Sequence, residues 1–482
     1  MRRRKFDIYL VIVLLLVTIG YFLYTHFSSE SKGVEIYAEA LKPYKEGDFE
    51  SAYKLFGKVP YSSSLKHPAL FRQARCATNI GDKSLAIKKY KKIVNSSSKS
   101  AIAPISHYNM AVIMYEEQNK NAKKHFKKII KEYPASDYAL ASNYYLGLLE
   151  ATNMPKGKRR QIKAKEKAIE YFKTYITKAP DGRFAINSVK AIKSLENTLT
   201  NYDNLLIAKV YYANGEYENS KKSLDGTTIS ESWVDYAKTE YRLNNKGKAN
   251  KYVEDGLTKY SSTVTQEDAY EVIDMYVNSF SPRTDGIKKL ETLKLKSTGA
   301  DYVAYLNCNE AVSLENKEAC YRTLYEKFPN GQFSAESLYN IFITKYLQKK
   351  YYDAQRLGFL HLKKFPNVKS SPAVTYFMGK IAYKLKHYES ANNYYKQVVS
   401  EYPDSYYAFR ANYNLHKDDG FLPFLELSFK PVIFPYKKSL DNNLVVKLAY
   451  LKDYDLVEEL CKNDKFIQSW ISYEKGTILF QQ

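Results

Sequence analysis

Residues 376–403 read YFMGKIAYKLKHYESANNYYKQVVSEYP, and this stretch decides how the rest of the chain is interpreted. Apolar residues recur every three to four positions on both sides of a short polar stretch at 386–389, which predicts two amphipathic helices. Gly379 and Ala391 are small enough to let the two helices approach closely, and Pro403 ends the second helix. The stretch therefore predicts a helical hairpin.

The frame of this hairpin recurs along the chain. From Gly379 an alanine follows after twelve residues, an aromatic residue after four more, and a proline after another eight. The last two steps, of four and eight residues, recur in Ala122-Phe126-Pro134 and Ala168-Phe172-Pro180, and weaker copies begin near Gly47, Gly81, Gly215, Gly247 and Ala319. Because each hairpin covers only its neighbours' apolar faces, the pattern predicts one elongated α-solenoid over residues 34–403, with about eight to ten hairpins.

These steps resemble the tetratricopeptide repeat, and the resemblance implies an all-α fold that holds a protein or peptide. In such an array the concave face is built mostly from the first helix of each hairpin. Tyr144 and Tyr145 lie on a predicted first helix, so they are candidates for contact with a partner. The alternative is that both tyrosines only pack between helices.

One copy of the frame is nine residues too long. Pro134 and Pro180 are 46 residues apart, whereas Pro366 and Pro403 are 37 apart, and the excess falls in the predicted hairpin loop before Ala168. This insertion predicts either a polybasic contact for a membrane surface or an anionic wall polymer, or merely a solvated loop and helix start. Its candidate contacts are Lys156, Lys158, Arg159, Arg160 and Lys163.

The N-terminal residues predict a membrane anchor. A basic tail (1–7) precedes an apolar run (8–27) that, as a helix, is long enough to span a bilayer. The basic tail should stay in the cytoplasm, which places the rest of the chain, after a linker at 28–33, on the periplasmic or wall side. The alternative is a cleaved signal, although the bulky residues that end the run do not form a cleavage site.

Charge and cysteine content restrict the remaining possibilities. The net charge of +22 could attract an anionic partner, but the lysines are spread over many helix faces, and an exported chain has little access to nucleic acid. Of four cysteines only Cys308 and Cys320 are close, and we expect two buried thiols there instead of a disulfide. No metal-ligand, phosphate-loop or nucleophile motif occurs, so we expect no cofactor.

The C-terminal segment, 404–482, carries a second resemblance. Ser405-Tyr406-Tyr407-Ala408 and the predicted helix pair at 443–460 resemble the region that closes the superhelical part of soluble lytic transglycosylases. The catalytic glutamate and its downstream Gly-Leu-Met-Gln motif in that family have no counterpart here, so we expect no enzyme activity. This segment is predicted to be a helical extension.

Together these patterns predict a single-pass membrane protein whose exported helical scaffold binds a protein or peptide partner in cell-envelope or wall-processing machinery. The alternative is the non-catalytic superhelical portion of a peptidoglycan lytic transglycosylase. A structural tether without a specific ligand is the third possibility.

Overall fold

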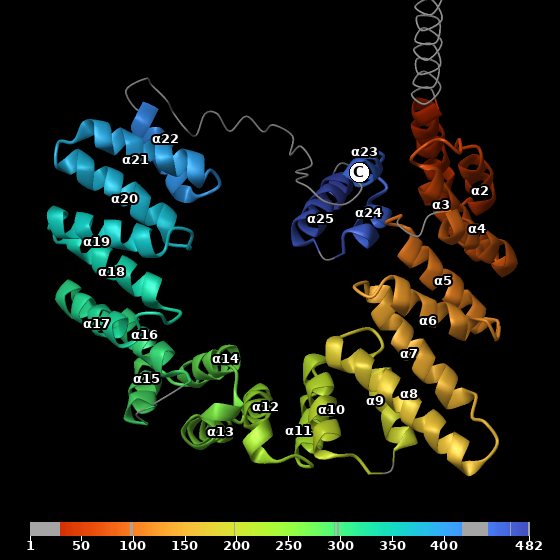
Figure 1. The fold of residues 1–482 in the computed structure, drawn as a ribbon, viewed down its shortest axis with the longest axis horizontal. Helices are drawn as coiled ribbons and strands as arrows, with labels where there is room; N and C mark the ends of the chain where they lie inside the picture. The colour runs from red at the N-terminus through yellow and green to blue at the C-terminus, as the bar shows by residue number, and fades with distance from the viewer. Residues whose placement is uncertain are drawn as a thin grey trace, which may run out of the picture. The chain divides into compact units, whose positions relative to one another are not determined.

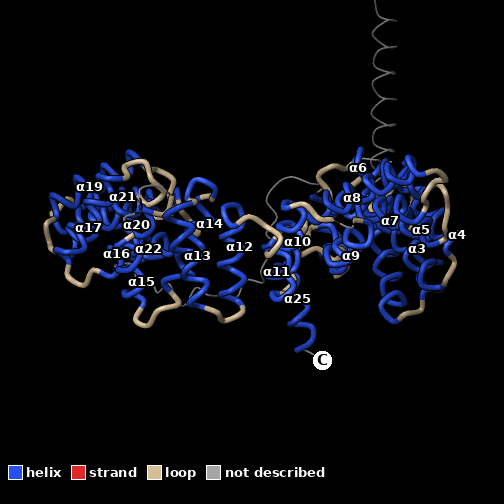
Figure 2. Tube along the Cα trace, turned by 90° about the horizontal axis from the view of Figure 1, so that it is seen from below, coloured by secondary structure: helices blue, strands red, loops and turns tan. Residues whose placement is uncertain are grey.

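A computed structural model describes residues 29–96, 100–196, 198–293, 295, 298–416, 442–462 and 464–480. Within these ranges the regular structure consists of α-helices and one short 3-10 turn, without any β-strand (Figures 1 and 2). This confirms the predicted all-α class. The predicted tail (1–7) and membrane segment (8–27) lie outside the described residues, and no described helix is long and apolar enough to cross a bilayer.

The described helices group into two compact units. Unit 1 contains the described residues of 29–196 and 442–480, and unit 2 contains those of 198–416. At the boundary between the units, α9 (Ala185–Leu195) ends in extended backbone at Glu196, and the next helix begins behind its own capping box of Thr200 and Asp203.

Unit 1 consists of four hairpins, the single helix α9 and three C-terminal helices. Residues 29–33, the described part of the predicted linker at 28–33, are helical. The hairpins pair the helix over 29–46 with α2 (Phe49–Gly57), α3 (Lys66–Ile80) with α4 (Lys83–Ser96), α5 (Ala103–Glu116) with α6 (Ala122–Glu132), and α7 (Asp137–Thr152) with α8 (Lys158–Lys178). The C-terminal helices are α23 (Asn442–Tyr450), α24 (Tyr454–Leu460) and α25 (Lys465–Phe480).

Unit 2 consists of six hairpins and the single helix α22 (Tyr406–His416). Pairing is therefore regular through the region where the sequence frame is weakest. The hairpins are α10 (Asn201–Ala213) with α11 (Tyr217–Leu224), α12 (Ile229–Arg242) with α13 (Lys246–Lys259), α14 (Gln266–Val277) with α15 (Arg283–Thr292), α16 (Ala300–Glu310) with α17 (Leu314–Lys327), α18 (Ser334–Leu347) with α19 (Tyr351–Lys364), and α20 (Ser371–Lys384) with α21 (Tyr388–Glu401). The 3-10 turn, Ser261–Thr263, lies between α13 and α14.

The small and aromatic residues of the frame pack as predicted. Ala168 and Phe172 are fully buried, and a Cβ atom at Gly147 would lie only 2.7 Å from the ring of Phe172. In unit 2 a Cβ atom at Gly379 would lie 2.6 Å from the ring of Tyr395. Paired helices thus touch where glycine faces an aromatic ring, which explains why the frame needs both residue types.

The nine-residue insertion extends a helix, which corrects the prediction of a longer loop. Helix α8 begins at Lys158 and runs for 21 residues, so only residues 153–157 connect it to α7. The inserted residues are rich in lysine, arginine and glutamine, which are good helix formers, and they continue the helix that Ala168 and Phe172 anchor.

The expectation of two free thiols at Cys308 and Cys320 is wrong, because the two residues form a disulfide. They lie on the paired helices α16 and α17, whose packing brings their Cα atoms to 5.3 Å, within the range that a disulfide spans. Cys76 and Cys461 are buried free thiols.

The predicted C-terminal extension divides between the two units. Helix α22 packs on α21 and continues the helices of unit 2, whereas α23, α24 and α25 belong to unit 1. A stretch of 25 residues, 417–441, lies between these parts in the sequence and outside the described residues.

Candidate protein-binding site

The C-terminal helices pack against the first helices of the unit 1 hairpins. Figure 1 shows α23–α25, in blue, beside the red and orange helices of the same unit. Leu448 of α23 and Val457 of α24 are fully buried, in one apolar cluster with Tyr37 and Leu41 of the helix over 29–46. Burying these branched aliphatic side chains stabilises the contact through the hydrophobic effect.

A buried ion pair lies at the centre of this contact. Asp453, between α23 and α24, accepts hydrogen bonds from the guanidinium of Arg72 on α3 and from the hydroxyl of Tyr37. The distances to Asp453 Oδ2 are 3.2 Å from Arg72 Nε and 2.7 Å from Tyr37 Oη. The side chains of Arg72 and Asp453 are only 4% and 2% exposed, and the guanidinium also lies over the ring of Tyr44 at 4.6 Å. Residues 381 positions apart in sequence therefore share one desolvated charge site.

The electrostatics of this site favour the charged pair. Burial, the largest single influence, would lower the pKa of Arg72, but the charge of Asp453, the neighbouring phenols of Tyr37 and Tyr44 and the hydrogen bond to Asp453 together hold that pKa above its usual value. Burial, together with the same carboxylate, raises the pKa of Tyr37, so the phenol stays protonated and remains a donor. The aspartate is thus held by one cation and one neutral donor.

Polar contacts surround the ion pair. Lys447 of α23 forms an ion pair with Glu30, and the backbone N–H of Ser64 donates to the same carboxylate at 2.9 Å. Burial would raise the pKa of Glu30, but the hydrogen bonds from Lys447 and Ser64 lower it to about 2. On the other side, the hydroxyl of Tyr138 on α7 donates to Glu459 of α24 at 2.7 Å.

Half-buried aromatic rings continue from Tyr138 along the first helices; we call them the aromatic cluster. Its members come from α5, α7 and the residue before α9: Tyr108, Tyr115, Tyr138, Tyr144, Tyr145 and Phe184. Tyr145 stacks on buried Phe126 with ring centroids 5.0 Å apart, and Tyr144 stacks on Phe184 at 4.3 Å with ring planes 3° apart. Burial raises the pKa of both tyrosines, so they remain neutral phenols.

The structure thus brings Tyr144 and Tyr145 together and leaves both side chains half-buried. Each uses one ring face for a neighbour and keeps part of its surface in solvent. Their role in binding a partner stays a prediction.

Sequence reasoning missed Phe184, although a short motif marks it. Pro180-Asp181-Gly182-Arg183-Phe184 has the spacing of Pro329-Asn330-Gly331-Gln332-Phe333 in unit 2. In both places the phenylalanine comes directly before a first helix and stacks on a tyrosine of the preceding first helix, with centroids 4.3 Å apart (Tyr144–Phe184 and Tyr305–Phe333). The recurrence of Pro-x-Gly-x-Phe could have identified both stacks.

The predicted basic contacts form a separate cluster at the start of α8. All five residues are exposed, and no ion pair to them is found among the described residues: Lys156, Lys158, Arg159, Arg160 and Lys163. The first turn of α8 contains no acid, and Gly157 offers no side-chain cap. Cations there oppose the helix dipole, so this end of α8 is electrostatically unfavourable. Their binding to an anionic surface stays a prediction.

A groove of about 650 Å³ lies beside the turn that precedes α8. It begins at Tyr115 of the aromatic cluster and ends at Thr152 and Asn153. Its remaining lining is mainly polar: Glu116, Gln118, Asn119, Lys120, Lys123 and Leu149.

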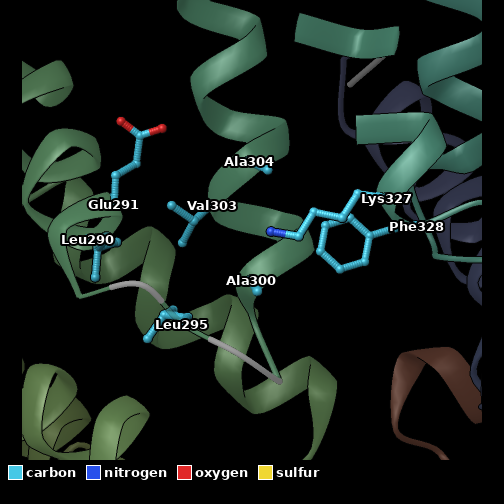
Figure 3. Close-up of a pocket in the computed structure, with 8 residues that line it drawn as sticks. All are labelled: Leu290, Glu291, Leu295, Ala300, Val303, Ala304, Lys327 and Phe328. Carbon is cyan, nitrogen blue, oxygen red and sulfur yellow. The ribbon is translucent and has the colours of Figure 1, made fainter. Parts of the chain in front are cut away.

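Unit 2 contains an apolar pocket of about 570 Å³ where α15 ends and α16 begins (Figure 3). Figure 3 shows Lys327 reaching toward Val303, while the carboxylate of Glu291 points away from the other labelled side chains. The remaining lining residues are Leu290, Leu295, Ala300, Ala304 and Phe328. Single charges on apolar walls give no pair of groups suited to acid–base or nucleophilic chemistry.

Comparison with known proteins identifies tetratricopeptide repeats in three segments, residues 68–100, 106–136 and 378–405. They correspond to the hairpins α3–α4, α5–α6 and α20–α21. No curated protein matches the chain. Three hairpins of this all-helical chain therefore match the tetratricopeptide repeat, and the resemblance to lytic transglycosylases gains no support.

Solved structures similar to the chain include three at low identity. The crystal structure of MamA protein is 19% identical over 45% of this chain and 96% of its own, with a TM-score of 0.27. The tetratricopeptide-repeat domain of P58(IPK) is 14% identical over 82% and 99%, with a TM-score of 0.26. The structure of Naa15/Naa10 bound to HypK-THB is 13% identical over 91% and 65%, with a TM-score of 0.29.

Proposed function

We propose that these tetratricopeptide repeats form a membrane-anchored scaffold outside the cytoplasm, which binds a protein or peptide segment through the aromatic cluster of unit 1. Helical repeat arrays commonly use their first helices for binding. The observation that carries the proposal is the row of half-buried rings on α5, α7 and the start of α9, including the Tyr144–Phe184 stack.

The packing of the rings makes them suitable for binding. Tyr144 and Tyr145 are fixed by stacking on Phe184 and Phe126, so little side-chain entropy is lost when a ligand covers them. Tyrosine combines a large apolar surface with a hydrogen-bonding tip, and it is enriched among residues that dominate binding energy. A rigid, half-exposed tyrosine surface therefore fits a peptide better than a charged metabolite.

Two features support a location outside the cytoplasm. The apolar run at 8–27 behind a basic tail suits a signal-anchor with a cytoplasmic N-terminus. The disulfide of Cys308 and Cys320 is a bond that persists in oxidising compartments and is rare in the cytosol. A scaffold held at this place would act within cell-envelope or wall-processing machinery.

Site-specific photo-crosslinking in living cells tests the binding surface. A crosslinking amino acid at Tyr144 should trap one defined protein, whereas the same group at Lys127, exposed on α6, should not. In the purified complex Phe184→Ala should weaken binding by at least about 1 kcal/mol because it removes the stacking partner of Tyr144. Equal crosslinking from both positions would contradict the proposal.

A glycan ligand is the competing possibility, and a separate binding experiment tests it. Retention of the full chain on purified peptidoglycan, reduced by Phe184→Ala, would favour a glycan strand over a peptide at the same rings.

Protease treatment of intact cells tests the proposed location. If the bulk of the chain stays uncut while an exported control protein in the same preparation is digested, the location outside the cytoplasm is contradicted.

A further inference from the structure

The first-helix face of unit 1 is already occupied next to the aromatic cluster. Helices α23 and α24 cover the helix over 29–46 and α3, the kind of surface that repeat arrays commonly offer to ligands. The occupant comes from the far end of the same chain. Its contacts therefore show which chemistry this face accepts.

The contacts of the occupant combine an apolar stripe with one carboxylate. Leu444, Val445 and Leu448 on α23 are at most 7% exposed, and Leu456 and Val457 on α24 at most 2%. Between these two groups lies Asp453, bonded to Arg72 and Tyr37. The face thus accepts branched aliphatic residues at helical spacing together with one buried acid.

The covalent connection between α23 and the first helices of unit 1 is long in sequence. Between them the chain passes through all of unit 2 and residues 417–441, so α23 and α24 resemble a ligand attached by a linker. A cavity of about 350 Å³ remains beside the ion pair, lined in part by Lys45, Arg72 and Lys475. A buried ion pair is weak evidence for a permanent contact, because desolvation offsets much of its attraction.

Arg72 determines what could replace the occupant. With α23 and α24 in place the guanidinium of Arg72 is only 4% exposed, so another segment that covered the same face would bury that guanidinium again. A basic or neutral segment would leave that cation unpaired, so only a segment with a carboxylate can take the place of Asp453. Charge complementarity therefore restricts the class of partner.

We propose that the face formed by residues 29–46 and α3 is a ligand groove that α23 and α24 close from within. Its external occupant is an amphipathic helical segment of a partner protein, whose aspartate or glutamate replaces Asp453 on Arg72 and Tyr37. The proposed groove rests on the proposed function in that its partner is a protein. The groove itself lies beside the aromatic cluster and is separate from it.

An exchange experiment on the full chain tests whether the occupant is separable. A protease site is inserted within 417–441, the purified chain is cut, and a fluorescent peptide of residues 442–482 is added. The peptide should enter the cut chain and displace its fragment, and it should bind the uncut chain far more weakly because the tethered copy competes at high effective concentration.

Two peptide variants test the chemistry of recognition. The Asp453→Asn peptide should bind about 10- to 100-fold more weakly, since a hydrogen-bonded charge is lost. The Tyr450→Ser peptide is the matched control, because Tyr450 is 81% exposed, and it should bind as well as the unaltered peptide. Equal affinity of the Asp453→Asn peptide would overturn the requirement for a carboxylate.

A crosslinker at Lys45, which donates a hydrogen bond to the Lys452 carbonyl, identifies the occupant in cells. The unaltered chain should crosslink to its own C-terminal helices, and Asp453→Asn should shift the product toward a partner peptide that contains Asp or Glu. No exchange after cutting, loss of unit 1 helicity when the fragment is released, or a trapped partner peptide without an acid would each overturn the groove. A negative crosslink from Tyr144 would overturn the proposed function alone.

Discussion

Replacing Asp453 by alanine should destabilise unit 1 by about 3–5 kcal/mol, the usual cost of removing one partner of a buried ion pair. The substitution leaves the guanidinium of Arg72, only 4% exposed, without its carboxylate and removes the acceptor of Tyr37. Because every 1.4 kcal/mol is a factor of ten, the docked population of α23–α25 should fall by about two to four orders of magnitude relative to the undocked one.

The two tryptophans of the chain allow the units to be measured separately. Trp470 lies on α25 of unit 1, edge-on to Tyr454 at 5.8 Å, whereas Trp233 is 1% exposed in the core of unit 2. In a Trp233→Phe background, urea titration of Trp470 emission should show the unit 1 midpoint moving to lower urea on Asp453→Ala. In a Trp470→Phe background the Trp233 transition should not move.

A neighbouring acid provides the matched control for this measurement. Asp455, two residues along the chain, is 77% exposed and pairs with Lys475 at 3.1 Å. Removing an exposed pair costs about 1 kcal/mol or less, so Asp455→Ala should shift the midpoint only slightly. Equal shifts from Asp453→Ala and Asp455→Ala would refute the buried site.

A double-mutant cycle then tests the coupling. Arg72→Met combined with Asp453→Leu replaces both charges with apolar groups, and the double variant should be more stable than either single variant. Additive losses would show that the two residues act independently and would contradict the reasoning.

Three further outcomes are expected. Gly256→Ala should destabilise unit 2 by about 1–3 kcal/mol, because the added Cβ would overlap the indole of Trp233. Gly247→Ala on the same helix is the control: its Cβ meets no atom within 4 Å, so this variant should stabilise unit 2 by up to about 1 kcal/mol. Both changes are measured as shifts of the urea midpoint. Burial lowers the pKa of His107 to about 4, so the unfolded chain binds more protons than the folded chain between pH 6.5 and 4. Unit 1 should therefore lose stability as the pH falls through this window. In unfolding measured at a series of pH values, His107→Gln should make that loss smaller. If the chain matures in an oxidising compartment, maleimide should label two of the four cysteines of the denatured chain without reductant, and all four after reduction. Labelling of all four cysteines without reductant would contradict the disulfide between α16 and α17.

The parts of the fold that the sequence predicted well depend on neighbouring residues. The spacing of Gly379, Ala391 and Tyr395 predicted a hairpin, and these residues meet where α20 packs on α21. Hairpins α10–α11 and α12–α13 were expected from Gly215 and Gly247, although the rest of the frame is degenerate there. Helical periodicity and close helix approach are local properties, so they are visible in a window of forty residues or fewer.

The errors occurred where local signals left two outcomes open. The insertion before Ala168 could lengthen a loop or a helix, and its helix-forming composition extended α8. Cys308 and Cys320 could remain thiols or join, and their helical positions brought them within bonding range. Tyr144 was identified as a candidate, but its stacking partner Phe184 lies forty residues later and was not.

The sequence by itself determined that the described chain is built of helical hairpins, because glycine, alanine and aromatic spacing within each copy fixes how its two helices pack. Only the tertiary structure decided that the described helices group into two units and that α23–α25 return to the first helices of unit 1. That return depends on Arg72 and Asp453, which are 381 positions apart and carry no shared periodicity. A charge that can be buried only beside its partner leaves no local trace in either segment.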